Sequence, residues 1–350
     1  MLTPRAKVMS VLRGELPSKT PFTMYECMIP QCTVERELRN RGMCIVRRTS
    51  TYRIERPNVT VKSIEFQDEN GRWLKRTTYS TKAGDLTTLT EQGINTVWTH
   101  EHMFKTKEDY KALYEFIKDS VIVPNYESAA KLVNSLGEDF VVRDQICLEP
   151  LQALISDFMG TETFCYEWMD NRDEVLKLYN ALTEMNRKIY SVVANGPLEF
   201  VNYGGNVVPA IIGRENFERY FMPHYAEAAE VLHKKNKLIG CHLDADNTII
   251  MDLIGQTPLD YIEAFDPGVG PSVADARQAW PDKVLWINWP SAWHLYSKED
   301  VYNKTIEMLE QAAPGNNFII GITEDIPEEV WQGNCLNIMN AIDDYYASKL

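Results

Sequence analysis

His242 and Asp244, at the end of a short apolar segment, are the residues whose types and spacing most favour chemistry. Residues 237–246 read as a strand, and strand side chains alternate between two faces, so His242 and Asp244 point the same way while Cys241 and Leu243 point the other. A histidine and a carboxylate at a strand end could bind a metal ion or form a proton-transfer pair. The spacing alone slightly favours a third interpretation, a histidine hydrogen-bonded to a carboxylate for structural reasons.

A second segment of the same kind lies near the end of the chain. Residues 317–325 read as a buried strand, and Glu324 follows it at a matching position. If the ends of the two strands converge, His242, Asp244 and Glu324 form a three-ligand site with room for a substrate. The pattern therefore predicts one site built from two distant parts of the sequence.

Composition limits the classes of protein that fit. The chain has 350 residues, a net charge of -14 and seven scattered cysteines without a C-x-x-C pair. An acidic chain without a basic stripe is a poor partner for nucleic acid, and an odd cysteine count argues against a disulfide framework. The sequence shows neither a signal-peptide core nor an apolar run of membrane-spanning length. We therefore expect a soluble cytoplasmic protein, and the question of a homodimer stays open.

Strand-like and helix-like segments alternate along most of the chain. Counting the regions around Tyr25 and Trp98, we predict eight strands, and this number favours a (β/α)8 TIM barrel with residues 1–350 as a single domain. Residues 53–90 alternate differently around a turn at 68–72 and predict a β-hairpin insertion. An open doubly wound sheet is the alternative, although no G-x-G-x-x-G follows an early strand.

Several segments, in their order, resemble the uroporphyrinogen decarboxylase superfamily over nearly the whole chain. They are the opening Thr3-Pro-Arg-Ala-Lys-Val, Thr81-Lys-Ala-Gly-Asp-Leu, Phe221-Met-Pro-His-Tyr, Trp286-Ile-Asn, and Gly321-Ile-Thr-Glu-Asp-Ile-Pro. No single motif is specific, and the order of the weak ones carries the resemblance. It implies a (β/α)8 barrel, in agreement with the strand count.

Two branches of that superfamily do different chemistry. The decarboxylases carry an arginine motif that binds porphyrinogen carboxylates, whereas this chain has Met24-Tyr-Glu-Cys-Met-Ile-Pro-Gln-Cys there, so we reject that activity. The other branch moves methyl groups to or from a corrinoid, and its thiol-activating members bind zinc through H-x-C and a distant cysteine. Here His242-x-Asp244 and Glu324 resemble those positions. Carboxylate ligands leave zinc a harder Lewis acid, which suits an oxygen-bound methyl donor better than a thiol.

The resemblance thus implies the methyltransferase component of an O-demethylase, with zinc held by His242, Asp244 and Glu324. The methyl group would pass from an aryl methyl ether to the Co(I) corrinoid (cobalamin) of a partner protein. Glu149 or Asp246 could instead donate a proton to the leaving oxygen. Side chains at or just beyond strand ends could contact the substrate, although such aromatic residues more often pack in the core. These candidates are Tyr25, Glu26, Asn202, Tyr203, Asn288, Trp289 and Trp293.

Two rival functions remain open on the same barrel. A metal-free decarboxylase or lyase would use His242 and Asp244 as an acid-base pair, and it would stay active in a chelator. A binding module that docks a corrinoid protein without catalysis is the second, although a binding surface needs no carboxylates inside a barrel. Metal content and turnover distinguish the three functions.

Overall fold

The computed structural model describes residues 2–93 and 96–349. Contacts divide the chain into two compact units. The first unit comprises the chain up to Ser50, Tyr126–Gln145, and the chain from Pro197 onward, and the second comprises Thr51–Asn125 and Ile146–Gly196. All of the strand ends that carry the candidate metal ligands belong to the first unit.

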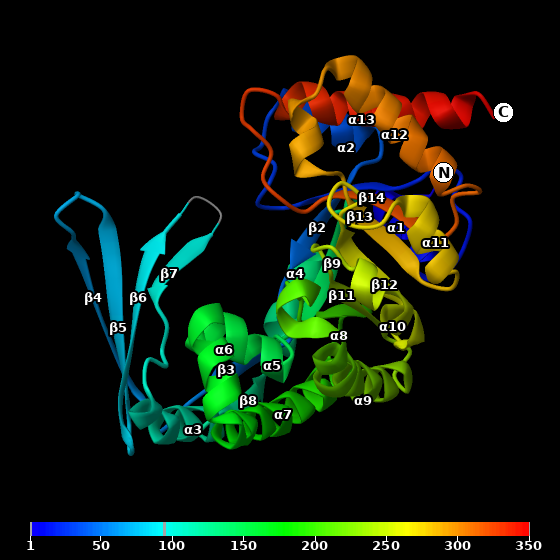
Figure 1. The fold of residues 1–350 in the computed structure, drawn as a ribbon. Helices are drawn as coiled ribbons and strands as arrows, with labels where there is room; N and C mark the ends of the chain where they lie inside the picture. Colours follow the sequence, from blue (N-terminus) through cyan, green and yellow to red (C-terminus); the bar gives the residue numbers. More distant parts are fainter. Residues whose placement is uncertain (1, 94–95, 350) are drawn as a thin grey trace. The chain divides into compact units, whose positions relative to one another are not determined.

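Parallel strands of the chain close into a barrel, which confirms the predicted (β/α)8 fold (Figure 1). The order around the barrel is β1-β14-β13-β12-β11-β10-β9-β2. The strands are β1 (Phe22–Tyr25), β2 (Cys44–Arg48), β9 (Phe140–Ile146), β10 (Phe200–Tyr203), β11 (Leu238–His242), β12 (Tyr261–Phe265), β13 (Val284–Asn288) and β14 (Phe318–Ile322). Because all of them run in the same direction, their C-terminal ends meet at one mouth, where the active sites of such barrels lie.

Large side chains fill the lower part of the barrel interior. Phe200, Tyr261 and Trp286 belong to one buried cluster, and their ring centroids lie 6.1–6.2 Å apart. Gly240 makes room for this packing, because a Cβ atom there would lie 2.2 Å from the Tyr261 ring. The interior is therefore a packed core below the mouth, not a channel.

Helices of the first unit separate most of the barrel strands along the sequence, and side-chain hydroxyl groups cap some of their N-termini. Thr3 accepts a hydrogen bond from the Ala6 N–H, and Ser297 accepts one from the Asp300 N–H. α12 and α13 pack side by side (Figure 1). The helices are α1 (Pro4–Leu12), α2 (Thr33–Asn40), α4 (Tyr126–Ser135), α8 (Pro209–Tyr220), α9 (Met222–His233), α10 (Met251–Gln256), α11 (Val273–Ala279), α12 (Lys298–Gln311) and α13 (Trp331–Ala347).

One of the eight predicted barrel strands is wrong. The region around Trp98 forms β7 (Val97–Glu101) in an antiparallel sheet of the second unit, and the eighth barrel strand is β2 instead. β2 has only five residues, and because two of them are the charged Arg47 and Arg48, its apolar part is too short to predict a strand. A short strand with a charged end thus gave too weak a pattern to recognise.

The second unit contains the predicted insertion, which is larger than a hairpin. β4 (Thr60–Gln67), β5 (Trp73–Thr81), β6 (Gly84–Gln92) and β7 form a four-stranded antiparallel sheet (Figure 1, cyan and blue). β3 (Tyr52–Glu55) pairs with β8 (Val121–Pro124) in a separate sheet. The helical elements are α3 (Tyr110–Lys118), α5 (Pro150–Ala153), the π-helix Leu154–Met159, α6 (Thr161–Asp170) and α7 (Arg172–Asn195). Among the described helices, none combines the length and apolarity needed to cross a membrane.

Candidate active site

His242, the last residue of β11, is held by polar groups from three sides of the barrel mouth. Its Nε2 atom lies 3.6 Å from Asp244 Oδ2, and its Nδ1 atom lies 3.3 Å from Glu263 Oε2 and 3.4 Å from the Tyr25 hydroxyl. Burial lowers the pKa of His242, but Asp244 and Glu263 raise it more strongly, to about 9. The predicted pair of His242 and Asp244 therefore exists, and a second carboxylate contacts the opposite ring nitrogen.

Glu263, in the middle of β12, joins the polar groups of the barrel interior. Its Oε2 atom accepts hydrogen bonds from Arg143 of β9 and Asn202 of β10, and Arg143 also donates to the Tyr25 hydroxyl at 3.1 Å. Burial would raise the pKa of Glu263, but the charge of Arg143 and the contact with His242 lower it well below its usual range. Glu263 is therefore an anion that holds one nitrogen of His242 in place.

Several polar atoms of this group are buried without a hydrogen-bond partner among the described residues. They are Arg143 Nε, Asn202 Oδ1, the Tyr261 hydroxyl and Glu263 Oε1. Buried polar atoms usually have partners, and those that have none in the protein mark places where a water, an ion or a ligand binds. Three of the four belong to Arg143, Asn202 and Glu263, whose other atoms connect to His242 or Tyr25, so this part of the barrel interior has room for further polar contacts.

The sequence predicted Tyr25, Asn202 and His242 as site residues but not Arg143 or Glu263. Both of the missed residues are charged and interrupt apolar strands, Phe140–Ile146 and Tyr261–Phe265. A charged residue inside a buried strand is rare unless it is paired, so this signal was available. The sequence carried no signal that these two residues pair, because their pairing depends on which strands face each other across the closed barrel.

The loop after β10 packs directly against His242. The Asn206 N–H donates to the His242 carbonyl at 3.1 Å, and Gly205 has a φ of +140°. A Cβ atom on Gly205 would lie 2.7 Å from the His242 Cβ. The absence of a side chain at Gly205 therefore lets this loop hold the histidine from outside the strand.

Carboxylates end the neighbouring strands on one side of the mouth. Burial raises the pKa of Asp266, at the end of β12, and the nearby charges of Glu324 and Asp244 raise it further. Asp266 accepts a hydrogen bond from the Gly268 N–H at 2.7 Å, and Glu324 accepts one from the Ser291 hydroxyl at 3.2 Å. The charges of Asp244 and Glu324 thus act on Asp266, as expected for strand ends that converge.

Two of the three predicted ligands, His242 and Asp244, already have the spacing that a zinc ion requires. Tetrahedral zinc with ligands at 2.0–2.2 Å separates its donor atoms by about 3.3–3.6 Å, and His242 Nε2 and Asp244 Oδ2 are 3.6 Å apart. The contact between Glu263 and the other ring nitrogen is typical of a zinc-binding histidine. Within residues 2–93 and 96–349, however, no three His, Cys, Asp or Glu side chains gather closely enough to hold an ion. Glu324 would have to move closer to His242 and Asp244 to become the third ligand.

The two predicted proton donors lie in different surroundings. Asp246 is exposed, and hydrogen bonds from the Thr248 hydroxyl and N–H lower the pKa of its carboxyl. It is therefore ionised at neutral pH, which does not favour proton donation. Glu149 belongs to the second unit, where it is fully buried and precedes α5.

The predicted substrate contacts divide into those that face the mouth and those that do not. Trp289 is buried and donates to Thr305 of α12, and the Tyr203 ring packs against Tyr225 of α9, so both side chains face the helical layer. Trp293 is half-buried beside Trp289. The remaining candidates lie at the mouth: Tyr25, Asn202, Asn288, which contacts Asp266 at 3.4 Å, and Glu26, which lies 3.5 Å from Arg47.

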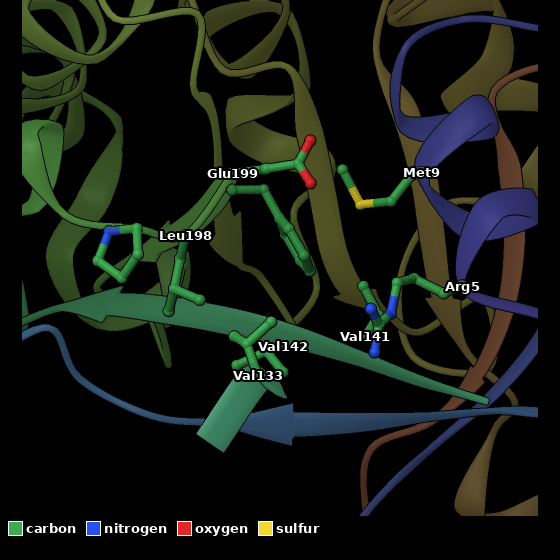
Figure 2. A pocket seen from close by; sticks show the side chains of 9 residues that line it. Arg5, Met9, Val133, Val141, Val142, Leu198 and Glu199 are labelled. Carbon is green, nitrogen blue, oxygen red and sulfur yellow. The ribbon is translucent and has the colours of Figure 1, made fainter. Parts of the chain in front are cut away.

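A pocket of about 70 Å³ lies at the other end of the barrel (Figure 2). Arg5 and Met9 of α1, Glu199 and the first residues of β9 line it. Arg5 uses its guanidinium to bind the Phe140 and Gly137 carbonyls, and Glu199 pairs with Arg13. These charges stabilise the N-terminal end of the barrel, so the pocket is distinct from the site around His242.

No protein-family model and no curated protein matches the sequence. Among solved structures, a methyltransferase from Methanosarcina mazei is similar with a TM-score of 0.60 at 12% identity, over 99% of this chain and 100% of that chain. A B12-independent methionine synthase from Shewanella matches with a TM-score of 0.48 at 9% identity, over 90% of this chain and 86% of that one. At such identities the likeness to the Methanosarcina protein shows the fold alone, and it extends over the whole chain.

Proposed function

We propose that this chain is a methyltransferase that takes a methyl group from an aryl methyl ether and passes it to the Co(I) corrinoid of a partner protein. The observation that carries the proposal is the placement of His242 between Asp244 and Glu263 at the mouth of the barrel. The likeness in fold to a methyltransferase over the whole chain supports it.

The difficulty of the reaction lies in the leaving group. The bond from the methyl carbon to the oxygen breaks, its electron pair stays on the oxygen, and the carbon bonds to the nucleophilic acceptor. A phenolate whose conjugate acid has a pKa of about 10 leaves reluctantly. Zinc, when bound, would supply a Lewis acid for the charge that develops on this oxygen.

The residues of the chain have distinct tasks in this proposal. His242, Asp244 and Glu324 would hold the ion. Glu263 binds Nδ1 of the His242 ring, so that Nε2 faces Asp244. The Tyr25 hydroxyl supports the same ring edge, and burial raises the pKa of this phenol, so it stays neutral.

The test is formation of a phenol from methoxylated aromatic compounds. The zinc-loaded protein is incubated without oxygen with each ether and cob(I)alamin, and the phenol is measured by liquid chromatography. We expect phenol from at least one ether, and its loss in His242→Ala and Asp244→Ala. His233→Ala is the matched control, because His233 pairs with Asp260 at 2.9 Å at the opposite end of the barrel. Equal turnover in all variants, or none in the wild type, would contradict the proposal.

A metal-free lyase or decarboxylase is the second candidate. The observation in its favour is that His242 and Asp244 already lie in contact, whereas Glu324 binds Ser291. His242 would then donate a proton, and Asp244 would orient its ring. Activity that persists after exhaustive chelation, and is lost in His242→Ala, would favour this candidate over methyl transfer.

A further inference from the structure

Arg48, the last residue of β2, carries its charge at the mouth of the barrel. Side chains of β2 alternate, and Cys44 and Val46 belong to the buried cluster inside the barrel, so Arg48 points inward as well. Its guanidinium carbon lies 4.2 Å from the centroid of the Tyr25 ring. The Tyr25 hydroxyl in turn contacts His242. Arg48 is therefore separated from the candidate reaction site by no more than one tyrosine side chain.

The hydrogen-bonding groups of Arg48 are poorly used within the protein. Nη2 donates to Cys27 Sγ at 3.1 Å, and sulfur is a weak acceptor. Nε has no hydrogen-bond partner among the described residues. The nearest carboxylate oxygen, on Glu26, lies 3.8 Å from Nε, beyond hydrogen-bond distance, and Arg47 lies closer to it at 3.5 Å. Nε itself is buried, but the Arg48 side chain as a whole is 34% exposed, so a ligand can approach its outer part.

Arg143, at the same level of the barrel, differs from Arg48 because its charge is paired with a buried carboxylate. Arg48 and Arg143 are register partners on adjacent strands, but Arg143 is buried and bound to Glu263. The carboxylates Asp244, Asp266 and Glu324 follow β11, β12 and β14 by one or two residues, whereas the arginines belong to β2 and β9. The three carboxylates thus lie on one side of the mouth, and Arg48 lies on the other side, where the Glu26 carboxylate is closer to Arg47 than to Arg48.

We propose that the methyl donor carries a carboxylate group and that Arg48 binds it. This inference rests on the proposed function, and it narrows the substrate class to methoxylated aromatic acids. A guanidinium binds a carboxylate through two parallel N–H···O bonds, which Cys27 cannot offer. The aromatic ring spans the mouth, so that its methoxy oxygen reaches His242 and Asp244 while its carboxylate stays at β2.

Binding to the isolated full-length protein tests this without any turnover. Isothermal titration calorimetry compares the ortho, meta and para isomers of methoxybenzoate with the corresponding neutral methoxybenzamides. We expect at least one acid to bind, and its amide to bind about tenfold more weakly or worse, because the amide lacks the charge. Benzoate should compete with that acid, since the carboxylate alone defines this end of the site.

Substitutions of Arg48 assign the binding to this residue. Arg48→Met should weaken binding of the acid about tenfold or more and leave the weak binding of the amide unchanged, whereas Arg48→Lys should lose only part of the affinity. Arg13→Met is the matched control, because Arg13 forms an exposed ion pair with Glu199 at the opposite end of the barrel. Circular dichroism verifies that each variant is folded.

Binding results alone can overturn the inference, independently of the proposed function. Equal affinity for an acid and its amide, or full affinity in a folded Arg48→Met protein, would show that Arg48 does not select a carboxylate. Failure of every acid to bind would do the same. Demethylation of neutral ethers alone would retain the proposed function and reject this substrate class. Binding of acids through Arg48 without demethylation would retain this ligand class and reject the proposed function.

Discussion

Arg143 and Glu263 form an ion pair inside the barrel, although two other strands separate β9 from β12 in the sheet. Both side chains are almost completely buried. The pair also connects Tyr25, Asn202 and His242, since each of these contacts one of its members. A buried ionic interaction therefore positions the residues of the candidate site, and removal of one partner alone would leave a buried charge.

Removal of either member of this pair should destabilise the protein strongly. Arg143→Met leaves Glu263 as a buried anion without its arginine, with His242 and Asn202 among its remaining partners, and Glu263→Leu leaves Arg143 as a buried cation. We expect each to lower the free energy of unfolding by about 3–5 kcal/mol, as measured by urea denaturation followed by tryptophan fluorescence.

The double variant Arg143→Met/Glu263→Leu should be more stable than either single variant, because no unpaired charge remains. Arg13→Met, which breaks an exposed ion pair, should cost about 1 kcal/mol or less. Additive losses in the double variant would show that the two charges do not depend on each other.

A side chain at Gly205 should disturb His242. The added Cβ of Gly205→Ala would lie 2.7 Å from the His242 Cβ, so either the loop or the histidine must move. We expect methyl transfer to fall by roughly tenfold to a hundredfold, because small displacements of reacting groups are costly. Gly213→Ala is the control: Gly213 also has a positive φ, of +72°, but nothing lies within 4 Å of its added Cβ. Equal losses in both variants would indicate backbone strain alone.

The buried His294 should make the protein less stable in acid. Burial lowers its pKa to about 4, below the ordinary value of 6.5, and the side-chain amide of Asn334 contacts its Nδ1 at 3.3 Å. Between these pH values the unfolded chain binds a proton that the folded protein excludes, so stability is lost as pH falls from 6.5 to about 4.

The loss should be on the order of 3 kcal/mol at pH 4. His294→Leu removes the titrating group, so the difference in unfolding free energy between wild type and variant should change across this window and stay flat above it. A difference that does not vary with pH would mean that His294 titrates alike in both states.

Zinc content should distinguish the ligands from other acidic residues. We expect about one zinc per chain by elemental mass spectrometry after dialysis, and loss of the metal in His242→Ala, Asp244→Ala and Glu324→Ala. Asp246→Ala should keep the metal, because Asp246 is bound to Thr248 on an exposed loop. Full occupancy in Glu324→Ala would remove Glu324 from the ligand set.

The fold could be read from the sequence because most of its barrel strands are short apolar runs that alternate with helical segments. The run that ends at His242 and the run that precedes Glu324 are both barrel strands. The region around Trp98 was wrongly predicted to be a barrel strand, because its alternating pattern also suits a strand in a sheet exposed to solvent. Local patterns identify a strand, but they do not say which sheet it joins.

Only the part of the candidate site whose residues share one strand end could be predicted from the sequence. His242 and Asp244 share a strand end, and the structure brings them into contact. The roles of Glu263 and Arg48 depend on barrel closure, which brings strands from distant parts of the sequence around one axis. Trp289 shows the opposite case: it follows a strand end, but its indole N–H binds Thr305 in the helical layer.

The pairing of Arg143 with Glu263 also constrains how this protein can evolve. A lineage that replaced one member alone would pass through a form with an unpaired buried charge, and selection would act against that form. Replacement of both at once requires two independent mutations in distant codons. We therefore expect descendants to keep the pair or to lose it as a unit, so its joint presence would trace common ancestry better than either residue alone.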